Sequence, residues 1–318
     1  MEVITLGNSG MVVSRLGMGC WAIGGHGWGR VDDTESIQAV RLAVERGITM
    51  FDTADVYGLG HSEEILSRAF RDHRRDVVIA SKFGIRWDHS GNTWKDISPK
   101  YMHQALEASL RRLHLDCIPL YYIHWPDGVT PIADTLGEMV RCKEKGKIRA
   151  IGVSNFSAPQ LREALSVSEI HAVQVRFNLI DRHGALELLQ LCAAHGIPLI
   201  TWGSLADGLL VGKFNAKTFF HKNDHRSRDP NFQGERFLRN LQFVHALRIM
   251  AAQFGVTVAQ LALRWLLDTP GVSCVLFGAK RPLQVKENLR AMRWRLFEED
   301  YQRVNNLLME ASASQRSQ

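Results

Sequence analysis

The chain lacks the features typical of membrane-spanning, secreted and disulfide-rich proteins. Its 318 residues contain no segment that approaches about 18 consecutive apolar residues, so we expect no membrane partner. The N-terminus, Met1–Thr5, has no basic region followed by an apolar one, so we expect no secretory signal. No CxxC pair occurs, and the five cysteines are dispersed: Cys20, Cys117, Cys142, Cys192 and Cys274. This pattern indicates reduced thiols and a cytoplasmic location.

The chain also lacks a long tract of one charge. Its formal net charge is +6, but the basic residues occur in small groups, often beside acidic ones. Because there is no long basic tract and no RNA-binding aromatic motif, we expect no nucleic-acid partner. A local positive site for a phosphate-bearing small molecule fits the charge better. No H-E-x-x-H pair is present, and we predict no metal site.

What the chain does contain is an alternation of short apolar runs and helical patterns. The strand-like runs fall at residues 16–20, 48–51, 77–82, 118–124, 148–153, 172–175, 198–202 and 271–276. They are nearly continuous in apolar residues, as parallel strands covered on both faces should be. Together they predict an α/β fold, a (β/α)₈ TIM barrel formed by one domain over residues 1–318. A doubly wound sheet is the rival, but no G-x-G-x-x-G follows the first strand.

Three segments lie outside this repeat. Residues 2–14 predict a β-hairpin turning at Gly7–Gly10, so that 1–15 would cap the bottom of the barrel. The polar segment 215–234 predicts a long loop of the kind that often carries function. Residues 310–318 are polar and predict a disordered tail.

Polar side chains follow three consecutive predicted strands: Asp52 and Tyr57, then Lys82, then His124. Each alone is more often structural, but the carboxyl ends of barrel strands meet at one face, where chemistry takes place. The set suits proton donation to a carbonyl. A phenol is a weak acid at neutral pH, and an ammonium group beside it should lower its pKa. We expect Lys82 to supply that charge, Asp52 to hold Lys82, and His124 to align the substrate oxygen.

These segments closely resemble the signature of the aldo-keto reductase superfamily, in particular its bacterial, sugar- and aldehyde-reducing branches. The matching motifs are Asp52–Gly58 with Ser62–Glu63, Ser81–Gly84, Tyr122–Pro126, Gly146–Arg149 running into Gly152–Phe156, Trp202–Lys213, and Gly278–Pro282 with Glu287–Asn288. The resemblance implies a barrel without a Rossmann domain that binds NADP(H) across its top. It also implies that Tyr57 is the general acid/base, with Asp52, Lys82 and His124 completing a catalytic tetrad.

The resemblance further implies a set of cofactor-binding residues. They are Ser154, Asn155 and Gln174 at the nicotinamide carboxamide, Trp202 stacked on the ring, Gly203, Ser204, Leu205, Gly208 and Lys213 around the pyrophosphate, Lys280 and Arg281 at the 2′-phosphate, Gln284 and Asn288 near the adenine, and Gly278 and Glu287 in the same motif. Two positions depart from the family pattern. Trp202–Leu205 reads Trp-Gly-Ser-Leu instead of Trp-Ser-Pro-Leu, and Phe177, preceded by Arg176, replaces a tyrosine.

Aromatic residues are candidates for the substrate pocket: Trp21, Trp28, Trp87 and Trp125. Arg86, Arg226 and Arg228 could recognise an anionic substrate, although solvated loop arginines are the more ordinary interpretation. The function expected is NADPH-dependent reduction of a small-molecule aldehyde or ketone. The alternatives are a dehydrogenase working oxidatively on a sugar or alcohol, and a slow-turnover cofactor-binding regulatory subunit. The sequence leaves open the substrate and whether the chain is a monomer or a homo-oligomer.

Overall fold

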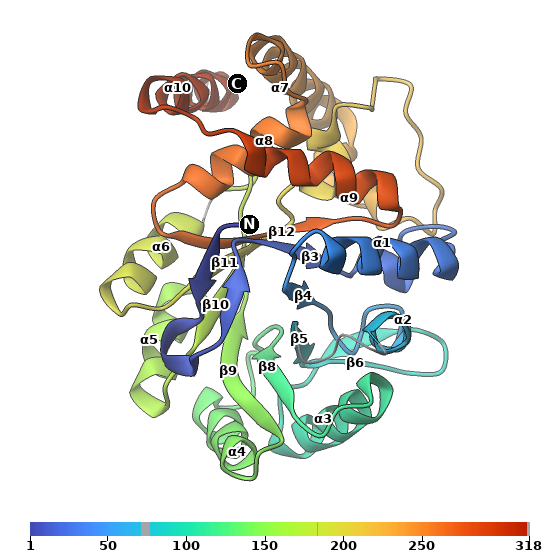
Figure 1. The fold of residues 1–318 in the computed structure, drawn as a ribbon, viewed down its shortest axis with the longest axis vertical. Helices are drawn as coiled ribbons and strands as arrows, with labels where there is room; N and C mark the ends of the chain where they lie inside the picture. Colours follow the sequence, from blue (N-terminus) through green and yellow to red (C-terminus); the bar gives the residue numbers. More distant parts are fainter. Residues whose placement is uncertain (71–76, 183, 317–318) are drawn as a thin grey trace.

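The computed structural model describes residues 1–70, 77–182 and 184–316. Eight parallel strands close into a barrel in the order β3, β4, β5, β8, β9, β10, β11, β12, as the sequence analysis predicted (Figure 1). Their bounds are β3 Leu16–Gly19, β4 Met50–Asp52, β5 Val78–Phe83, β8 Ile118–Ile123, β9 Ile148–Ser154, β10 Ala172–Arg176, β11 Leu199–Trp202 and β12 Val272–Gly278. The closed order excludes the doubly wound alternative, because an open sheet has two edges and a barrel has none.

Helices surround the barrel and cover its outer face (Figure 1). They are α1 Asp33–Glu45, α2 His61–Phe70, α3 Pro99–Leu113, α4 Ile132–Glu144, α5 Ala158–Val167, α6 Ala185–Ala194, α7 Gly234–Gln253, α8 Val258–Asp268, α9 Pro282–Leu289 and α10 Glu298–Arg316. Their starts follow the local chemistry: the side chain of Asp32 accepts the backbone N–H of Glu35 at 2.9 Å and so caps α1. The tail prediction was wrong for 310–316, which continue α10 as helix; residues 317–318 lie outside the described part.

Two apolar layers hold the barrel together. The larger lies between the strands and the helices, and the smaller fills the barrel interior. In the interior, the ring of Tyr122 packs directly on Gly152, where a Cβ atom would lie 2.3 Å from the ring. A side chain on residue 152 would therefore displace Tyr122 from the core.

The N-terminal hairpin closes one end of the barrel, which confirms its prediction. Strands β1 (Val3–Thr5) and β2 (Val12–Ser14) pair antiparallel. Leu6, Met11 and Val13 are buried in the same cluster as the interior residues of the barrel strands. This end is sealed by apolar contact, so a ligand can reach the interior only from the other end.

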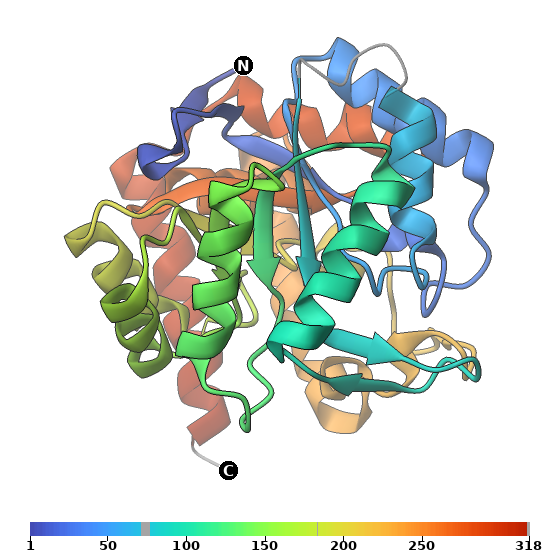
Figure 2. The same ribbon diagram turned by 90° about the horizontal axis from the view of Figure 1, so that it is seen from below.

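Two long excursions occupy the open end, to which the strand arrowheads point in Figure 2. One is a second hairpin, β6 (Ile85–Trp87) with β7 (Thr93–Lys95), which the sequence analysis did not predict. The other is the segment 213–233, here called the strap, which contains the short 3₁₀ turns His225–Ser227 and Pro230–Phe232. The hairpin and the strap lie close to each other beyond the strand ends (Figure 2).

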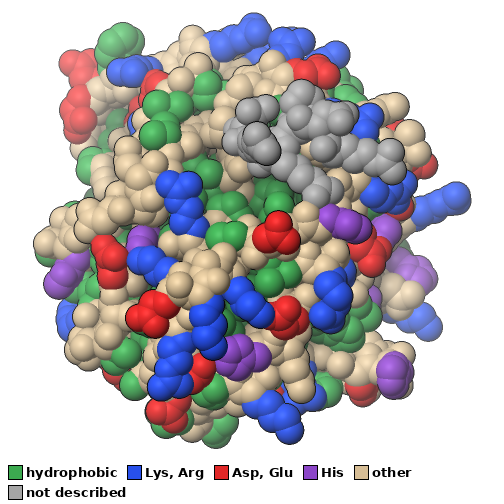
Figure 3. Space-filling model, turned by 60° about the horizontal axis from the view of Figure 1, so that its bottom comes forward, with side chains coloured by type: hydrophobic (Ala, Val, Ile, Leu, Met, Phe, Trp, Pro, Cys, Tyr) green, Lys and Arg blue, Asp and Glu red, His purple; other side chains and the backbone are tan. Residues whose placement is uncertain are grey.

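The outer surface carries mixed charge. On the face drawn in Figure 3, Lys and Arg side chains lie among Asp and Glu side chains, without a continuous patch of one sign. Among the described residues no single helix is long and apolar enough to cross a membrane. Only α7 and α8 taken together, bent by 83°, reach that length and composition.

Candidate active site

The four candidate catalytic residues meet at the open end of the barrel. Asp52 ends β4, Lys82 lies near the end of β5, and His124 follows β8, so three adjacent strands deliver them to one place. Tyr57 comes from the turn after β4. That turn is held by close packing of backbone on backbone, because a Cβ atom on Gly58 (φ +64°) would lie 2.2 Å from the carbonyl oxygen of Gly24. Only glycine fits there.

Lys82 is the centre of this group. Its side chain is fully buried, and Nζ donates to Oδ1 of Asp52 at 2.6 Å, to the carbonyl oxygen of Thr53 at 2.8 Å and to the hydroxyl of Tyr57 at 3.3 Å. The three acceptors account for the three protons of an ammonium group. Asp52 in turn accepts Nε2 of Gln174 at 2.7 Å. The structure thus forms a continuous chain from Gln174 through Asp52 and Lys82 to the phenol.

The pKa of Tyr57 shifts in the direction opposite to the expectation. Burial raises the pKa of Tyr57 well above its ordinary value, and the Asp52 carboxylate adds to the rise. The expected lowering by Lys82 does not prevail, because the phenolate would lose its water of solvation. Tyr57 therefore holds its proton at neutral pH, as a proton donor must. Lys82 remains in place to stabilise the phenolate formed once the proton has left.

His124 lies beside Tyr57, with the two ring centroids 5.6 Å apart and nearly perpendicular. Burial lowers the pKa of His124 well below its ordinary value, and the charge of Lys82 lowers it further. The imidazole is consequently neutral and can offer one N–H to an oxygen without carrying charge into the site.

Asp55 is buried close to the tetrad, but its side-chain hydrogen bond is to Tyr101. Its Oδ2 accepts the hydroxyl of Tyr101 at 3.2 Å. Burial raises the pKa of Asp55 well above its usual range, and the neighbouring Glu63 adds to the effect. These contacts give Asp55 a structural role between β4 and α3.

The residues expected at the nicotinamide form one hydrogen-bonded group. Asn155, in the left-handed region at φ +58°, donates from Nδ2 to the carbonyl oxygen of His124 and to Oγ of Ser154, both at 3.0 Å. Trp202 donates from Nε1 to Oδ1 of Asn155 at 3.0 Å. Asn155, Gln174 and Trp202 line the cavity above Tyr57, whereas Ser154 is buried beneath. Gln174 also supports Asp52, a role that the sequence did not reveal.

A groove of about 340 Å³ extends from Tyr57 and Trp202 towards the start of α9. Ten of the expected cofactor residues line it: Trp202, Gly203, Ser204, Leu205, Gly208, Lys213, Gly278, Lys280, Arg281 and Gln284. Asn288 lies beneath, donating to the carbonyl oxygen of Gly278 at 3.5 Å, and the carbonyl of Glu287 accepts Nε2 of Gln260 at 3.0 Å. Those two residues do not line the groove.

The far end of the groove suits an anion. Lys280 and Arg281 precede α9, and their backbone N–H groups both donate to Oε1 of Gln284, at 2.8 and 3.1 Å. Burial lowers the pKa of Lys280, and the charges of Arg226 and Arg281 lower it further. Crowded cations at a helix N-terminus gain stability when a phosphate binds. The residues present therefore fit a dinucleotide with an additional phosphate.

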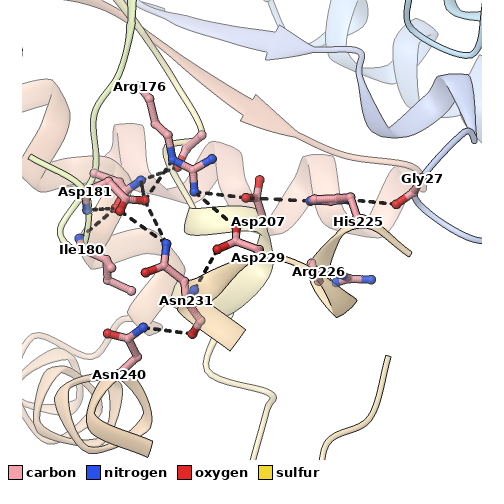
Figure 4. Close-up of polar contacts among 12 residues, drawn as sticks. Gly27, Arg176, Ile180, Asp181, Asp207, His225, Arg226, Asp229, Asn231 and Asn240 are labelled. Carbon is pink, nitrogen blue, oxygen red and sulfur yellow. Dashed lines mark hydrogen bonds and ion pairs between the residues drawn. The ribbon is translucent and has the colours of Figure 1, made fainter. Parts of the chain in front are cut away.

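A polar network joins the turn after β11 to the strap (Figure 4). Arg176, at the end of β10, donates to Asp181 at 2.9 Å and to Asp207 at 3.1 Å, and its guanidinium lies 5.2 Å from the ring of Trp202. Nε2 of His225 lies 3.8 Å from Oδ2 of Asp207, and Nδ1 of the same ring lies 2.8 Å from the carbonyl oxygen of Gly27. The sequence analysis noted Arg176 as unusual but found no role for it. Only the folded chain places it beside Asp207.

The cavity above Tyr57 has a volume of about 1250 Å³. Its apolar walls are Trp21, Val56, Ile85, Trp125 and Trp202. Of the expected substrate residues, Trp21 and Trp125 line this cavity, Trp28 lines the neighbouring groove, and Trp87 lines neither. Ile85 and Thr93 bring the unpredicted hairpin β6–β7 into the wall.

His221 and His225 stand four residues apart, which is a spacing that metal sites use. They lie in the strap, where no helix aligns them on one face, and Nδ1 of His225 contacts Gly27. Within residues 1–70, 77–182 and 184–316, no three His, Cys, Asp or Glu side chains are grouped to hold a metal ion.

Comparison with known proteins adds two kinds of similarity. Residues 15–309 match the model of the Aldo/keto reductase family. The chain is 38% identical to aldo-keto reductase YhdN of Bacillus subtilis, over 97% of this chain and 94% of that protein. It is 34% identical to the NADH-specific methylglyoxal reductase of Escherichia coli, over 94% of this chain and 96% of that protein.

Solved structures of related enzymes have the same fold as this chain. The glycerol dehydrogenase of Gluconobacter oxydans superimposes with a TM-score of 0.87 at 37% identity, covering 95% of this chain and 93% of the other. An aldo-keto reductase of Klebsiella pneumoniae in complex with NADPH superimposes with a TM-score of 0.75 at 27% identity, covering 97% and 95%.

Proposed function

Because the chain belongs to the aldo/keto reductase family, we propose that it is an NADPH-dependent reductase of aldehydes or ketones in which Tyr57 is the general acid. One observation carries the proposal: the phenol of Tyr57 lines an open cavity while its oxygen lies 3.3 Å from the buried Nζ of Lys82. A proton donor with a charge partner already in place needs no rearrangement when the proton moves.

The proposed step uses the chain's residues as follows. The residues of the groove would hold NADPH, which would supply the hydride for the carbonyl carbon. Tyr57 donates its proton to the carbonyl oxygen, and the phenolate that remains is stabilised by Lys82 and regains a proton from solvent. His124, neutral in its buried position, hydrogen-bonds the same oxygen and fixes its direction.

The choice of NADPH rests on the groove. Lys280 and Arg281 place two cations at its far end, and the 2′-phosphate of NADPH would give them an anionic partner that NADH lacks. The Klebsiella enzyme, solved with NADPH, supports the choice, whereas the Escherichia coli relative named NADH-specific shows that cofactor preference differs among similar proteins.

The test is Tyr57→Phe. This change removes the acid but keeps the ring, so we expect turnover to fall by about 10²–10⁴-fold while NADPH affinity stays within about threefold. Stopped-flow or steady-state loss of NADPH absorbance, with aryl aldehydes and sugars as substrates, measures the first effect. Fluorescence titration with NADPH measures the second. Full activity in the variant would contradict the assignment.

Oxidation of an alcohol is the second candidate, favoured by the similarity to a glycerol dehydrogenase. In that direction Tyr57 must act as a base, and the burial that raises its pKa works against it at neutral pH. We therefore expect reduction to dominate near neutrality and oxidation to accelerate as the pH rises. Steady-state rates in both directions at several pH values distinguish the two. Single-turnover oxidation of bound NADPH, compared with the steady-state rate, separates either enzyme from a slow cofactor-holding subunit.

A further inference from the structure

The outer rim of the substrate cavity carries two arginines whose side chains have no partner among residues 1–70, 77–182 and 184–316. Arg30, from the loop after β3, and Arg228, from the strap, both line the cavity. Both are exposed, and neither side chain forms a hydrogen bond or an ion pair with the residues that the structure describes. This distinguishes them from Arg86, which pairs with Asp96 at 3.0 Å, and from Arg226, which pairs with Asp224 at 2.6 Å.

The same lining offers little negative charge. Its only carboxylate among the described residues is Asp224. That group is already occupied by Arg226, whose Nε and Nη2 contact its two oxygens at 2.9 and 2.6 Å. A third cation stands close by, since Nζ of Lys95 lies 4.8 Å from the ring centroid of the wall residue Trp125. The rim is therefore positive and lacks its own counter-charge.

The two loops that carry these arginines are joined to each other. The backbone N–H of His225 donates to the carbonyl oxygen of Gly27 at 2.9 Å, and Nδ1 of the same histidine is 2.8 Å from that oxygen (Figure 4). Arg30 follows Gly27 by three residues and Arg228 follows His225 by three. The junction of the two loops thus presents both cations to the same cavity.

The interior of the cavity is different in character, with Trp21, Val56 and Trp125 around Tyr57. A ligand that fills the cavity would have its carbonyl at Tyr57, an apolar or hydroxylated middle, and its far end at the rim. We propose that the preferred substrates are carbonyl compounds carrying a carboxylate or a phosphate monoester, recognised by Arg30 and Arg228. This inference rests on the proposed function for its reacting end and on the two free guanidinium groups for its anionic end.

Matched substrate pairs test the inference: 4-carboxybenzaldehyde against methyl 4-formylbenzoate, and glyceraldehyde 3-phosphate against glyceraldehyde. In each pair the anionic compound should have the higher kcat/KM. The ratio of kcat/KM for the anionic compound to kcat/KM for its neutral counterpart should fall by about tenfold in Arg30→Gln/Arg228→Gln. The fall should come mainly from KM, because two exposed charge contacts are lost. The ratio should also fall when salt rises from about 0.05 to about 0.5 M. The two pairs separate carboxylate from phosphate recognition.

Arg46→Gln is the matched control, because Arg46 is also exposed and lines a separate hollow with Met1 and Glu2. It follows α1 at the closed end of the barrel, and its loss should leave the ratio unchanged. A ratio near one in the unaltered protein, or a ratio unaffected by the double substitution, overturns the inference.

A binding measurement keeps the inference separate from the reductase proposal. Tryptophan fluorescence should show tighter binding of 4-carboxybenzyl alcohol than of its methyl ester, with the difference lost in the double variant. If this preference is seen but no carbonyl compound consumes NADPH, the reductase function fails and the anion site stands. If neutral aldehydes are reduced without any anion preference in binding or turnover, the anion site fails and the reductase function stands.

Discussion

Two of the buried carboxylates at the open end of the barrel, Asp52 and Asp207, each hold a cation, and they do different work. Asp52 holds Lys82 at 2.6 Å, and Asp207 holds Arg176 at 3.1 Å. Lys82 is fully buried, and its third contact is the phenol of Tyr57. Arg176 is about a quarter exposed, and its further contacts are more carboxylates, Asp181 and Asp229. The comparison shows that an ion pair acquires a chemical role from what the cation touches next.

The positions of the two pairs explain the difference. Lys82 and Asp52 lie on adjacent barrel strands, whose register holds them within the precision that proton transfer needs. Arg176 ends a strand, but its partners come from a loop and the strap. We therefore expect the first pair to act on the substrate through Tyr57, and the second to support the strap above the cofactor groove.

The largest expected effect comes from breaking the first pair. Lys82→Met should lower kcat by about 10²–10⁴-fold, because the phenolate of Tyr57 loses its stabilising charge. It should also cost about 3 kcal/mol of unfolding free energy by leaving Asp52 buried without its partner. Steady-state kinetics and urea unfolding measure the two effects. Lys82→Met/Asp52→Asn, which removes both charges, should recover stability but not kcat. If Lys82→Met alone kept its full kcat, the proposed difference in role between the Lys82–Asp52 pair and the Arg176–Asp207 pair would be wrong.

Breaking the second pair should have a smaller and different effect. Among the described residues, Arg176→Met leaves the buried Asp207 with only His225 as a charged partner, so we expect a loss of about 1–3 kcal/mol in unfolding free energy. Amide exchange in residues 213–233 should accelerate, and kcat should stay within about tenfold. Hydrogen-exchange mass spectrometry measures the amide exchange of residues 213–233, with the hairpin β1–β2 as an internal reference. A loss of kcat as large as that of Lys82→Met would show that the second pair is catalytic.

The smallest effect concerns His225. Burial alone would lower its pKa, but Asp207, Gly27 and Asp224 raise it above the ordinary value of 6.5. Since the folded pKa lies above the unfolded one, the charged imidazole stabilises the fold fully below about pH 6.5, and this contribution is lost as the pH rises through the folded pKa. His225→Gln should remove that pH dependence, at a cost below about 1 kcal/mol at low pH. Thermal unfolding at a series of pH values measures this dependence. If the melting temperature of the variant changed with pH as steeply as that of the unaltered protein, the prediction would be contradicted.

Much of the open end could be predicted from the sequence because it depends on local order. Asp52, Lys82 and His124 stand at the carboxyl ends of apolar runs, and parallel strands of a closed barrel necessarily bring those ends together. The β-hairpin cap could be predicted for a similar reason: two short apolar segments flank a turn of glycines. Even the wrong expectation for residues 310–316 has a local cause, because a polar composition does not exclude a helix that starts upstream.

Contacts between loops could not be predicted in this way. Arg176, Asp207, His225 and Gly27 are far apart in sequence, and no periodicity relates a strand end to a loop that crosses above it. The same holds for Arg30 and Arg228, whose shared rim exists only because His225 reaches Gly27. The raised pKa of Tyr57 is a third case, since the sequence supplies the neighbouring ammonium but not the depth of burial that outweighs it.

The sequence by itself thus determined the barrel, the candidate residues for proton transfer and the cations of the cofactor groove. Strand periodicity and strand-end chemistry are properties of short segments, so they can be recognised in the sequence without knowledge of the packing. The tertiary structure alone decided the direction in which the pKa of Tyr57 shifts, the network behind Trp202 and the unpaired charge at the rim. Those depend on desolvation and on distances between segments remote in the chain, which arise only when the chain is folded.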